Sequence, residues 1–338
     1  MATFTAGAIG VDFDILDLGP LALAPIAGAT PTSVALNLAG VSTQLYGVGF
    51  TFGASGPPTT GTIQRIIVGV DAGTVYDIAG VSISATTFRN WVATGDNASA
   101  KAGIFAGSDL FTGSGVDDRL RAYAGADTLN GGGGADVLDG GDGDDQVFGG
   151  TGADTIVDPT GSNYLRGEDG DDYIVGGVGF DDINGNMGAD TADGGPGDDW
   201  VVGGKDNDLL YGDTGNDLVY GNLGDDVLFG GDGADTMRGG QANDSLSGGA
   251  GNDFVSGDRG EDTMTGGTGA DIFHSSNEVG TDRVLDFSLA EGDRVMLDPG
   301  TTFSVAVVGG DTVITVTGGQ IILVGVTTPL PAGTIFGA

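Results

Sequence analysis

One apolar residue returns every nine positions between Gly113 and His274, which divides this segment into 18 units without an insertion. The eighth position of each unit is Leu, Ile, Val, Met or Phe, except in the unit that contains Ala192. Its neighbours are mostly polar, and glycine fills much of the remainder. A three-residue strand with its middle side chain turned inward accounts for this pattern. The period predicts a solenoid in which short strands and turns alternate.

The sixth position of every unit carries an oxygen-bearing side chain, which is Asp in 17 units and Asn163 in one. Stacked turns bring these carboxylates close together, so the turns require cations between them. Oxygen ligands on a flexible turn suit Ca²⁺ better than Mg²⁺. The candidate metal ligands are Asp118, Asp127, Asp136, Asp145, Asp154, Asp172, Asp181, Asp190, Asp199, Asp208, Asp217, Asp226, Asp235, Asp244, Asp253, Asp262 and Asp271.

The flanking segments lack the repeat. Residues 1–106 contain alternating stretches such as TIQRIIVGV, which predict short strands, with one possible helix at 86–96. Residues 275–338 contain GGDTVITVTGGQIILVGV, which predicts a small β cap. We therefore expect an all-β chain with a β-rich N-terminal domain (1–106), a repeat domain (107–274) and a C-terminal cap (275–338).

Units such as 131–139 and 230–238 match G-G-x-G-x-D-x-U-x and resemble the RTX, or haemolysin-type, calcium-binding nonapeptide. The resemblance implies a parallel β-roll with two units per coil, hence about nine coils. It also implies that calcium lies between turns i and i+2, bound by sixth-position carboxylates and turn carbonyls. Eighteen turns then offer about 16 calcium sites. Three units depart from the pattern, 158–166, 203–211 and 239–247, and we expect the first to bind calcium most weakly.

Charge narrows the choice of partner. The formal net charge is −37, and residues 113–274 hold 34 acidic and six basic residues. This charge repels nucleic acid and attracts cations. The absence of cysteine excludes disulfides and thiolate metal sites.

No N-terminal signal peptide and no apolar stretch of transmembrane length is visible in the sequence. The segment TDRVLDFSLAEGDRVMLD, within 275–338, resembles the region that caps an RTX roll and carries an uncleaved type I secretion signal. The resemblance implies a secreted, extracellular protein, with cell-surface association as a possibility. Asp282, Asp286 and Asp293 in this segment are interpreted as turn and cap residues rather than metal ligands.

The sequence offers no recognisable catalytic motif, and we expect no enzyme activity. His274 is the one histidine, which excludes an H-E-x-x-H zinc site, and a G-x-S-x-G elbow is absent. Paired carboxylates could form among Asp12, Asp14, Asp71 and Asp77, although turn residues are the simpler reading. We expect His274 to lie on the ordinary outer surface of the roll.

Seventh and ninth positions face outward, and between residues 200 and 229 they become apolar. We expect these residues to form an interface, and a heterologous contact to build a sheet or filament from copies of the chain. The sequence thus favours a secreted calcium-binding structural protein. A calcium-dependent adhesin or glycan-binding module is the alternative, and a polysaccharide-active enzyme is third. The candidate interface residues are Trp200, Val202, Leu209, Tyr211, Leu218, Tyr220, Val227 and Phe229.

Overall fold

The computed structural model describes residues 105–275 and 280–337 with their side chains, together with Ala102 and the backbone of six strands between Thr3 and Ser84. All of the elements in this described part are β-strands, and the chain divides into two compact units, Met1–Asp158 and Pro159–Ala338. The possible helix at 86–96 lies outside the described residues. The predicted domain boundaries at 106/107 and 274/275 remain predictions.

The first unit opens with an antiparallel sheet in the order β2-β3-β4-β5-β6-β1, whose strand β1 then pairs in parallel with β7. Strands β7, β9 and β11 form one parallel sheet of coils, and β8, β10 and β12 form a second. The bounds are β1 Thr3–Ala6, β2 Ile26–Thr30, β3 Ser33–Leu38, β4 Val41–Thr51, β5 Thr60–Val70, β6 Gly73–Ser84, β7 Leu110–Thr112, β8 Arg119–Arg121, β9 Thr128–Gly133, β10 Val137–Asp139, β11 Gln146–Thr151 and β12 Thr155–Val157.

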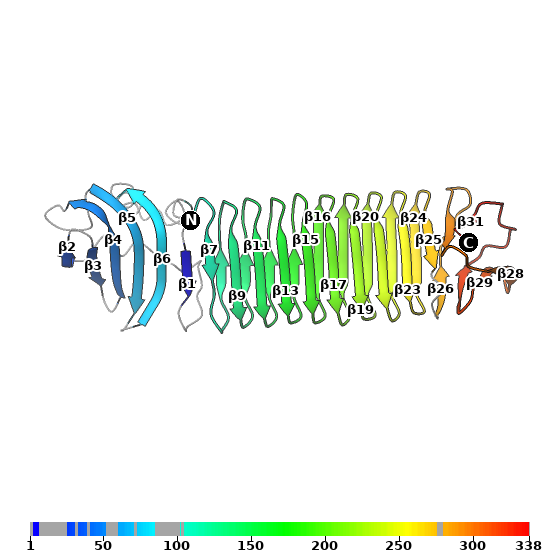
Figure 1. The fold of residues 1–338 in the computed structure, drawn as a ribbon, viewed down its shortest axis with the longest axis horizontal. Helices are drawn as coiled ribbons and strands as arrows, with labels where there is room; N and C mark the ends of the chain where they lie inside the picture. Colours follow the sequence, from blue (N-terminus) through cyan, green and yellow to red (C-terminus); the bar gives the residue numbers. More distant parts are fainter. Residues whose placement is uncertain are drawn as a thin grey trace. The chain divides into compact units, whose positions relative to one another are not determined.

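The second unit by itself has the same two-sheet winding, and its strands from β13 to β27 follow one another in chain order (Figure 1). The first sheet contains β13 Tyr164–Asp169, β15 Asp182–Met187, β17 Trp200–Lys205, β19 Leu218–Leu223, β21 Thr236–Gln241, β23 Phe254–Arg259, β25 Ile272–Ser275, β27 Arg294–Leu297 and β31 Ile335–Phe336. The second contains β14 Tyr173–Val175, β16 Thr191–Pro196, β18 Leu209–Thr214, β20 Val227–Asp232, β22 Ser245–Ala250, β24 Thr263–Thr268 and β26 Gly280–Val284.

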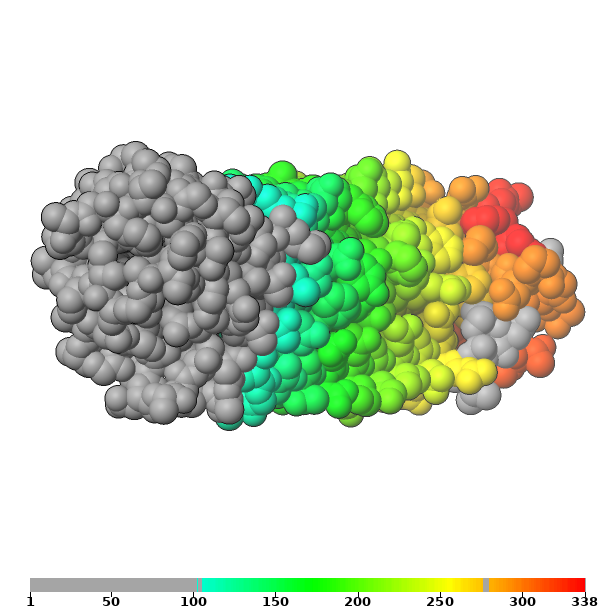
Figure 2. All heavy atoms as spheres, turned by 60° about the vertical axis from the view of Figure 1, so that its left-hand side comes forward, coloured from blue at the N-terminus to red at the C-terminus, as the bar shows by residue number. Residues whose placement is uncertain are grey.

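The cap extends this second sheet. Strand β26 pairs in parallel with β30 (Gly319–Leu323), which pairs antiparallel with β29 (Asp311–Thr315), and β29 pairs with β28 (Ser304–Val308). The coils of the second unit appear as successive bands of colour from green to yellow in Figure 2.

Parallel neighbours in each sheet are 18 residues apart, as in Trp200 beside Leu218, so one coil contains two nonapeptides. The eighth-position side chains form the interior of the roll, and all 18 of them, from Leu120 to Phe273, are at most 2% exposed. Phe111 precedes this column and Val284 and Val295 follow it, each fully buried. Each unit by itself therefore contains parallel two-sheet coils of the β-roll type. The predicted fold class is confirmed.

Candidate calcium-binding turns

The sixth-position aspartates point into the turns and are buried, with exposures of 0–4%. In 15 of the 17, the Oδ1 atom accepts a hydrogen bond from the backbone amide of the residue 18 positions earlier, as Asp208 does from Asp190. These bonds measure 2.6–2.9 Å along the array. One carboxylate oxygen therefore ties each coil to the next.

The second carboxylate oxygen, Oδ2, lacks such a hydrogen bond in many of these aspartates. Among the described residues, 13 of these aspartates have an Oδ2 atom that is buried and has no hydrogen-bond partner. A buried acceptor without a partner loses its hydrogen bonds to water and gains none from the protein. For a charged group, this raises the free energy of the folded state considerably. These residues are Asp127, Asp136, Asp181, Asp190, Asp199, Asp208, Asp217, Asp226, Asp235, Asp244, Asp253, Asp262 and Asp271.

The unbonded oxygens converge with backbone carbonyls. A Cβ atom added to Gly212, at the first position of its unit, would lie 2.6 Å from Asp217 Oδ2 and 2.6 Å from the carbonyl oxygen of Gly230. The first-position glycine thus leaves room for a small cradle lined by oxygen from two successive coils. No group of three or more His, Asp or Glu side chains gathers within the described residues. A cation in such a cradle therefore draws further ligands from the backbone.

Burial dominates the electrostatics of the turns. It raises the pKa of Asp208 and Asp244 from the ordinary 3.8 to about 8, and that of Asp190 and Asp199 to about 7. Repulsion from carboxylates in neighbouring coils adds to the increase, and the amide hydrogen bond opposes it. The turns therefore hold carboxylates whose ionised form is destabilised unless a positive charge is present.

These features fit calcium. The donors are all oxygens, the carboxylates are paired from coil to coil, and the turns are built from backbone rather than a rigid octahedral cage. When bound, the ion would supply the positive charge and the coordination that the Oδ2 atoms lack. The structure places the predicted metal ligands, the sixth-position aspartates, in the turns of successive coils.

Two of the three non-consensus units form the same turn, but with a strained backbone at one residue. Asp206 and Ala242 replace the glycine at the fourth position and adopt φ values of 72° and 86°, a region that disfavours side chains. In the third unit, Asp158 stands where the first glycine is expected, and it is fully buried beside Asp145. Asn163 in this unit donates from Nδ2 to the carbonyl of Gly176 at 3.4 Å.

Three further aspartates occupy the same place outside the 18 units. Asp109 Nα–H donates to Asp127 Oδ1, and Asp109 is followed by the inward residue Phe111. Asp282 and Asp293 accept from the amides of Asp262 and Asp271 and are each followed two residues later by a buried valine. The sequence marks these three aspartates only by the short pattern D-x-U-x, in which U is the buried apolar residue. The nine-residue frame misses them because no glycine pair precedes the pattern and because Asp282 and Asp293 lie 20 and 22 residues after their partners.

The candidate interface residues form two compact patches, one on each sheet of the second unit. Trp200 and Leu218 are cross-strand neighbours, as are Val202 and Tyr220, and we name these four residues the β17–β19 patch. On the other sheet Leu209 neighbours Val227 and Tyr211 neighbours Phe229, and these four are the β18–β20 patch. The rings of Tyr211 and Phe229 stack with centroids 5.1 Å apart. Trp200 is 41% exposed, and Leu218 and Phe229 are each 38% exposed.

The expectation that His274 lies on the ordinary surface is wrong, since this residue is only 7% exposed. Strand β27 continues the sheet beside it, and the ring of Phe254 stacks on the imidazole at 5.7 Å. Ser256 Oγ lies 3.0 Å from His274 Nδ1, and Asp298 Oδ1 lies 3.3 Å from Nε2. Ser256 is fully buried and donates to Asp258 Oδ1 at 2.7 Å.

This hydrogen-bonded group borders a polar hollow of about 510 Å³ on the face of the first sheet. Charged and amide side chains from several coils face it, and Arg238 pairs with Asp258 at 3.5 Å. Its lining residues are Asn222, Leu223, Arg238, Gly240, Gln241, Asp258, Arg259, His274 and Asp298.

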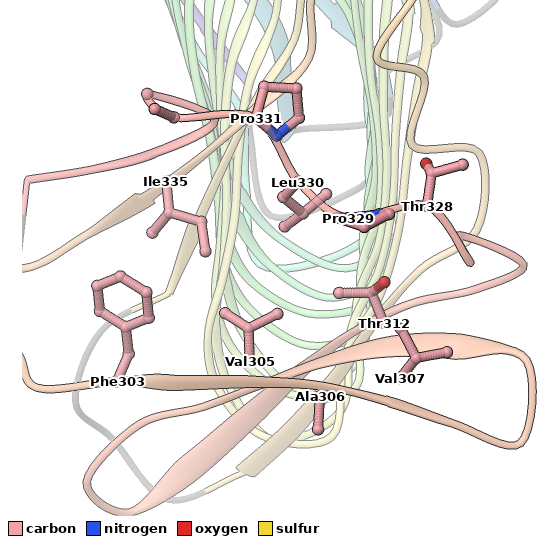
Figure 3. A pocket seen from close by; sticks show the side chains of 12 residues that line it. Phe303, Val305, Ala306, Val307, Thr312, Thr328, Pro329, Leu330, Pro331 and Ile335 are labelled. Atoms are coloured by element: carbon pink, nitrogen blue, oxygen red, sulfur yellow. The ribbon is translucent and has the colours of Figure 1, made fainter.

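A second cavity, of about 450 Å³, lies in the cap and is largely apolar (Figure 3). Phe303, Val305 and Val307 line one side, and Leu330 and Ile335 line the other. No carboxylate contributes to its lining, so this cavity is chemically separate from the acidic turns. Asp12, Asp14, Asp71 and Asp77, the candidate carboxylate pairs, lie outside the side chains that the structure describes. No helix among the described residues has the length and apolar character needed to cross a membrane.

Comparison with known proteins agrees with this geometry. The family model of the RTX calcium-binding nonapeptide repeat matches repeatedly across residues 105–273. No curated protein matches the chain significantly. Among solved structures, the extracellular lipase LipA from Serratia marcescens matches with 16% identity over 68% of this chain and 40% of its own length, at a TM-score of 0.28. RTX repeats are typical of secreted bacterial proteins and bind calcium. With the repeat model covering half of its length, the chain belongs to the RTX calcium-binding nonapeptide-repeat family.

Proposed function

We propose that the chain is a secreted structural protein whose calcium-loaded roll assembles with further copies of itself into a layer, filament or matrix. The observation that carries this proposal is the pair of apolar patches on the two sheets. Each places four apolar or aromatic side chains together on an outer face of a chain that is otherwise strongly acidic. Apolar groups gathered on an exposed face favour contact with another molecule.

Two patches on two sheets allow a chain to bind two neighbours at once. If the β17–β19 patch of one copy contacts the β18–β20 patch of the next, the contact is heterologous and growth continues. Calcium would favour assembly by reducing charge repulsion, because about 16 bound ions would offset roughly 32 of the negative charges that keep copies of the chain apart. Assembly should therefore require calcium at concentrations that fill the turns.

Light scattering in millimolar calcium tests the proposal. We expect large particles for the wild type, and monomers after either Trp200→Asp or Phe229→Asp, because each substitution removes one half of the heterologous contact. Growth that stops at dimers in both variants would instead indicate like-with-like contacts. Thr263→Asp, which adds the same charge on β24 away from both patches, is the control. A wild type that stays monomeric in calcium at high concentration contradicts the proposal.

A calcium-dependent glycan-binding module is the second candidate, and the polar hollow favours it. Arginine, amide and carboxylate side chains such as Arg238, Gln241 and Asp258 can bond sugar hydroxyls, and the hollow is large enough for a saccharide unit. A glycan array probed with the calcium-loaded protein distinguishes the two functions. Binding that is abolished by Arg238→Ala but unaffected by Trp200→Asp would support the glycan-binding module.

A further inference from the structure

Three aspartates of the cap face the last coils of the roll. Asp282 lies in β26, and Asp286 and Asp293 lie in the connection that leads to β27. From the sequence, all three are interpreted as turn and cap residues. Their hydrogen bonds separate Asp282 from the other two.

Asp286 and Asp293 are fully engaged by backbone amides. The two carboxylate oxygens of Asp286 accept from Gly266 at 3.0 Å and from Gly267 at 2.8 Å. Those of Asp293 accept from Asp271 at 3.1 Å and from Ser288 at 2.7 Å. Both side chains therefore cap backbone amides at the end of the roll, and each of their carboxylate oxygens already accepts a hydrogen bond.

Asp282 has the geometry of a ladder residue instead. Its Oδ1 atom faces the amide of Asp262 at 3.3 Å, and the carboxylate is 5% exposed. Arg283 and the fully buried Val284 follow it and pair with Thr263 and Met264, which continues the seventh- and eighth-position register of the preceding coil. Asp262 is itself fully buried, and its Oδ2 atom has no hydrogen-bond partner.

We propose that Asp262 and Asp282 hold a further calcium ion, beyond the nonapeptide array, that joins the last coil to the cap. The proposal rests on calcium binding by the roll and deepens it. The juxtaposition carries the argument: two buried carboxylates from successive coils converge, with Asp262 N 3.3 Å from Asp282 Oδ1, and no N–H or O–H group donates to Asp262 Oδ2.

This ion would control the order of the cap. Strand β26 is the link between the roll and the cap sheet, and Asp282 itself is the register partner of Ile321 in β30. Neutralising the Asp262–Asp282 pair removes the repulsion that pushes β26 away from β24. Calcium would thereby stabilise β30 and β29 through β26, although neither strand contributes a carboxylate to the site.

The test combines ion counting with hydrogen exchange on the full chain. Native mass spectrometry at saturating calcium should show one ion fewer for Asp282→Asn than for the wild type, and an unchanged count for Asp286→Asn, the matched control. Asp262→Asn should lose more than Asp282→Asn, because Asp262 also pairs with Asp244 in the array.

At saturating calcium, amide exchange in residues 319–323 should be faster in Asp282→Asn than in the wild type, while exchange in residues 218–223 stays unchanged. An unchanged ion count together with unchanged exchange in the cap would overturn the proposal. A wild type that binds no calcium at all would instead contradict the function of the whole roll, and a failure of assembly in the light-scattering experiment would leave this site untouched. The two failures are therefore distinguishable.

Discussion

The interior column and the turns of the roll are stabilised in different ways. The column from Leu120 to Phe273 is complete in itself, because every side chain in it is shielded from water by its neighbours. The turns are incomplete, because they bury carboxylates and leave an oxygen of many of them unbonded. The comparison shows that one repeat can combine a self-sufficient core with a shell that requires a ligand. Hydrophobic burial alone then does not decide whether the roll is folded.

The largest expected effect comes from removing calcium at different pH values. The turn carboxylates have folded pKa values of about 6–8, as in Asp217, Asp190 and Asp208, against 3.8 in an ordinary environment. Because the folded values are raised, their stabilising contribution is present below pH 4 and is lost as the pH rises through 6–8.

Calcium-free protein should therefore be unfolded at pH 8 and regain β-structure near pH 5, as measured by circular dichroism. Calcium-loaded protein at pH 8 is the control and should be folded. A calcium-free chain that is equally ordered at pH 5 and pH 8 would show that the turns do not limit folding.

A cavity in the column should act independently of calcium. Leu228→Ala removes most of a fully buried side chain and should lower the free energy of unfolding by about 2–5 kcal/mol. Urea denaturation at two saturating calcium concentrations measures this loss. Similar losses of unfolding free energy at the two calcium concentrations would confirm that the column and the turns contribute separately. A loss that disappears at the higher calcium concentration would show that their contributions are coupled.

A methyl group in a turn should have a smaller effect that depends on calcium. A Cβ at Gly221 would meet the Asp226 carboxylate and would lie 2.7 Å from the carbonyl oxygen of Gly239, inside the cradle. Gly221→Ala should cost about 1–3 kcal/mol and raise the calcium concentration at the folding midpoint. Gly115→Ala is the matched control, since nothing lies within 4 Å of a Cβ there. Equal midpoints for the two variants would argue against a cation in the cradle.

The smallest effect should be a gain. Ala242 adopts a φ of 86°, which costs an L-residue roughly 1 kcal/mol relative to glycine. Ala242→Gly should therefore stabilise the calcium-loaded protein by about 1 kcal/mol in urea denaturation. A loss of stability instead would mean that the Ala242 methyl group packs favourably in this turn.

Most of the roll could be predicted from the sequence, because its two essential columns are visible in the nine-residue period. The apolar eighth position predicted the interior from Leu120 to Phe273, and the sixth position predicted which carboxylates enter the turns. Both depend on local spacing, which a repeat preserves. Strands β7, β26 and β27 lie outside the 18 units because the sequence beside them lacks the glycine pairs.

The remainder depends on contacts that the period does not contain. His274 is buried because residues 294–298 return beside it, a contact between segments of different spacing. The exposed fifth position also has a role: the side chain of Asn216 accepts from the amide of Ala234, so this position forms an outer ladder. No hydrophobic pattern marks such a polar bond. The three cap aspartates could be separated only once their amide partners were known.

The 18-residue step between coils makes the length of the roll adjustable in whole steps. The register between neighbouring strands of the array advances by 18 residues, so an excision of 18 residues, such as 240–257, closes without changing the face of any strand that follows. An excision of nine would instead move every later strand to the opposite wall and deliver the cap to the wrong sheet. Coil-sized duplications and losses are thus the changes in size that this architecture can absorb.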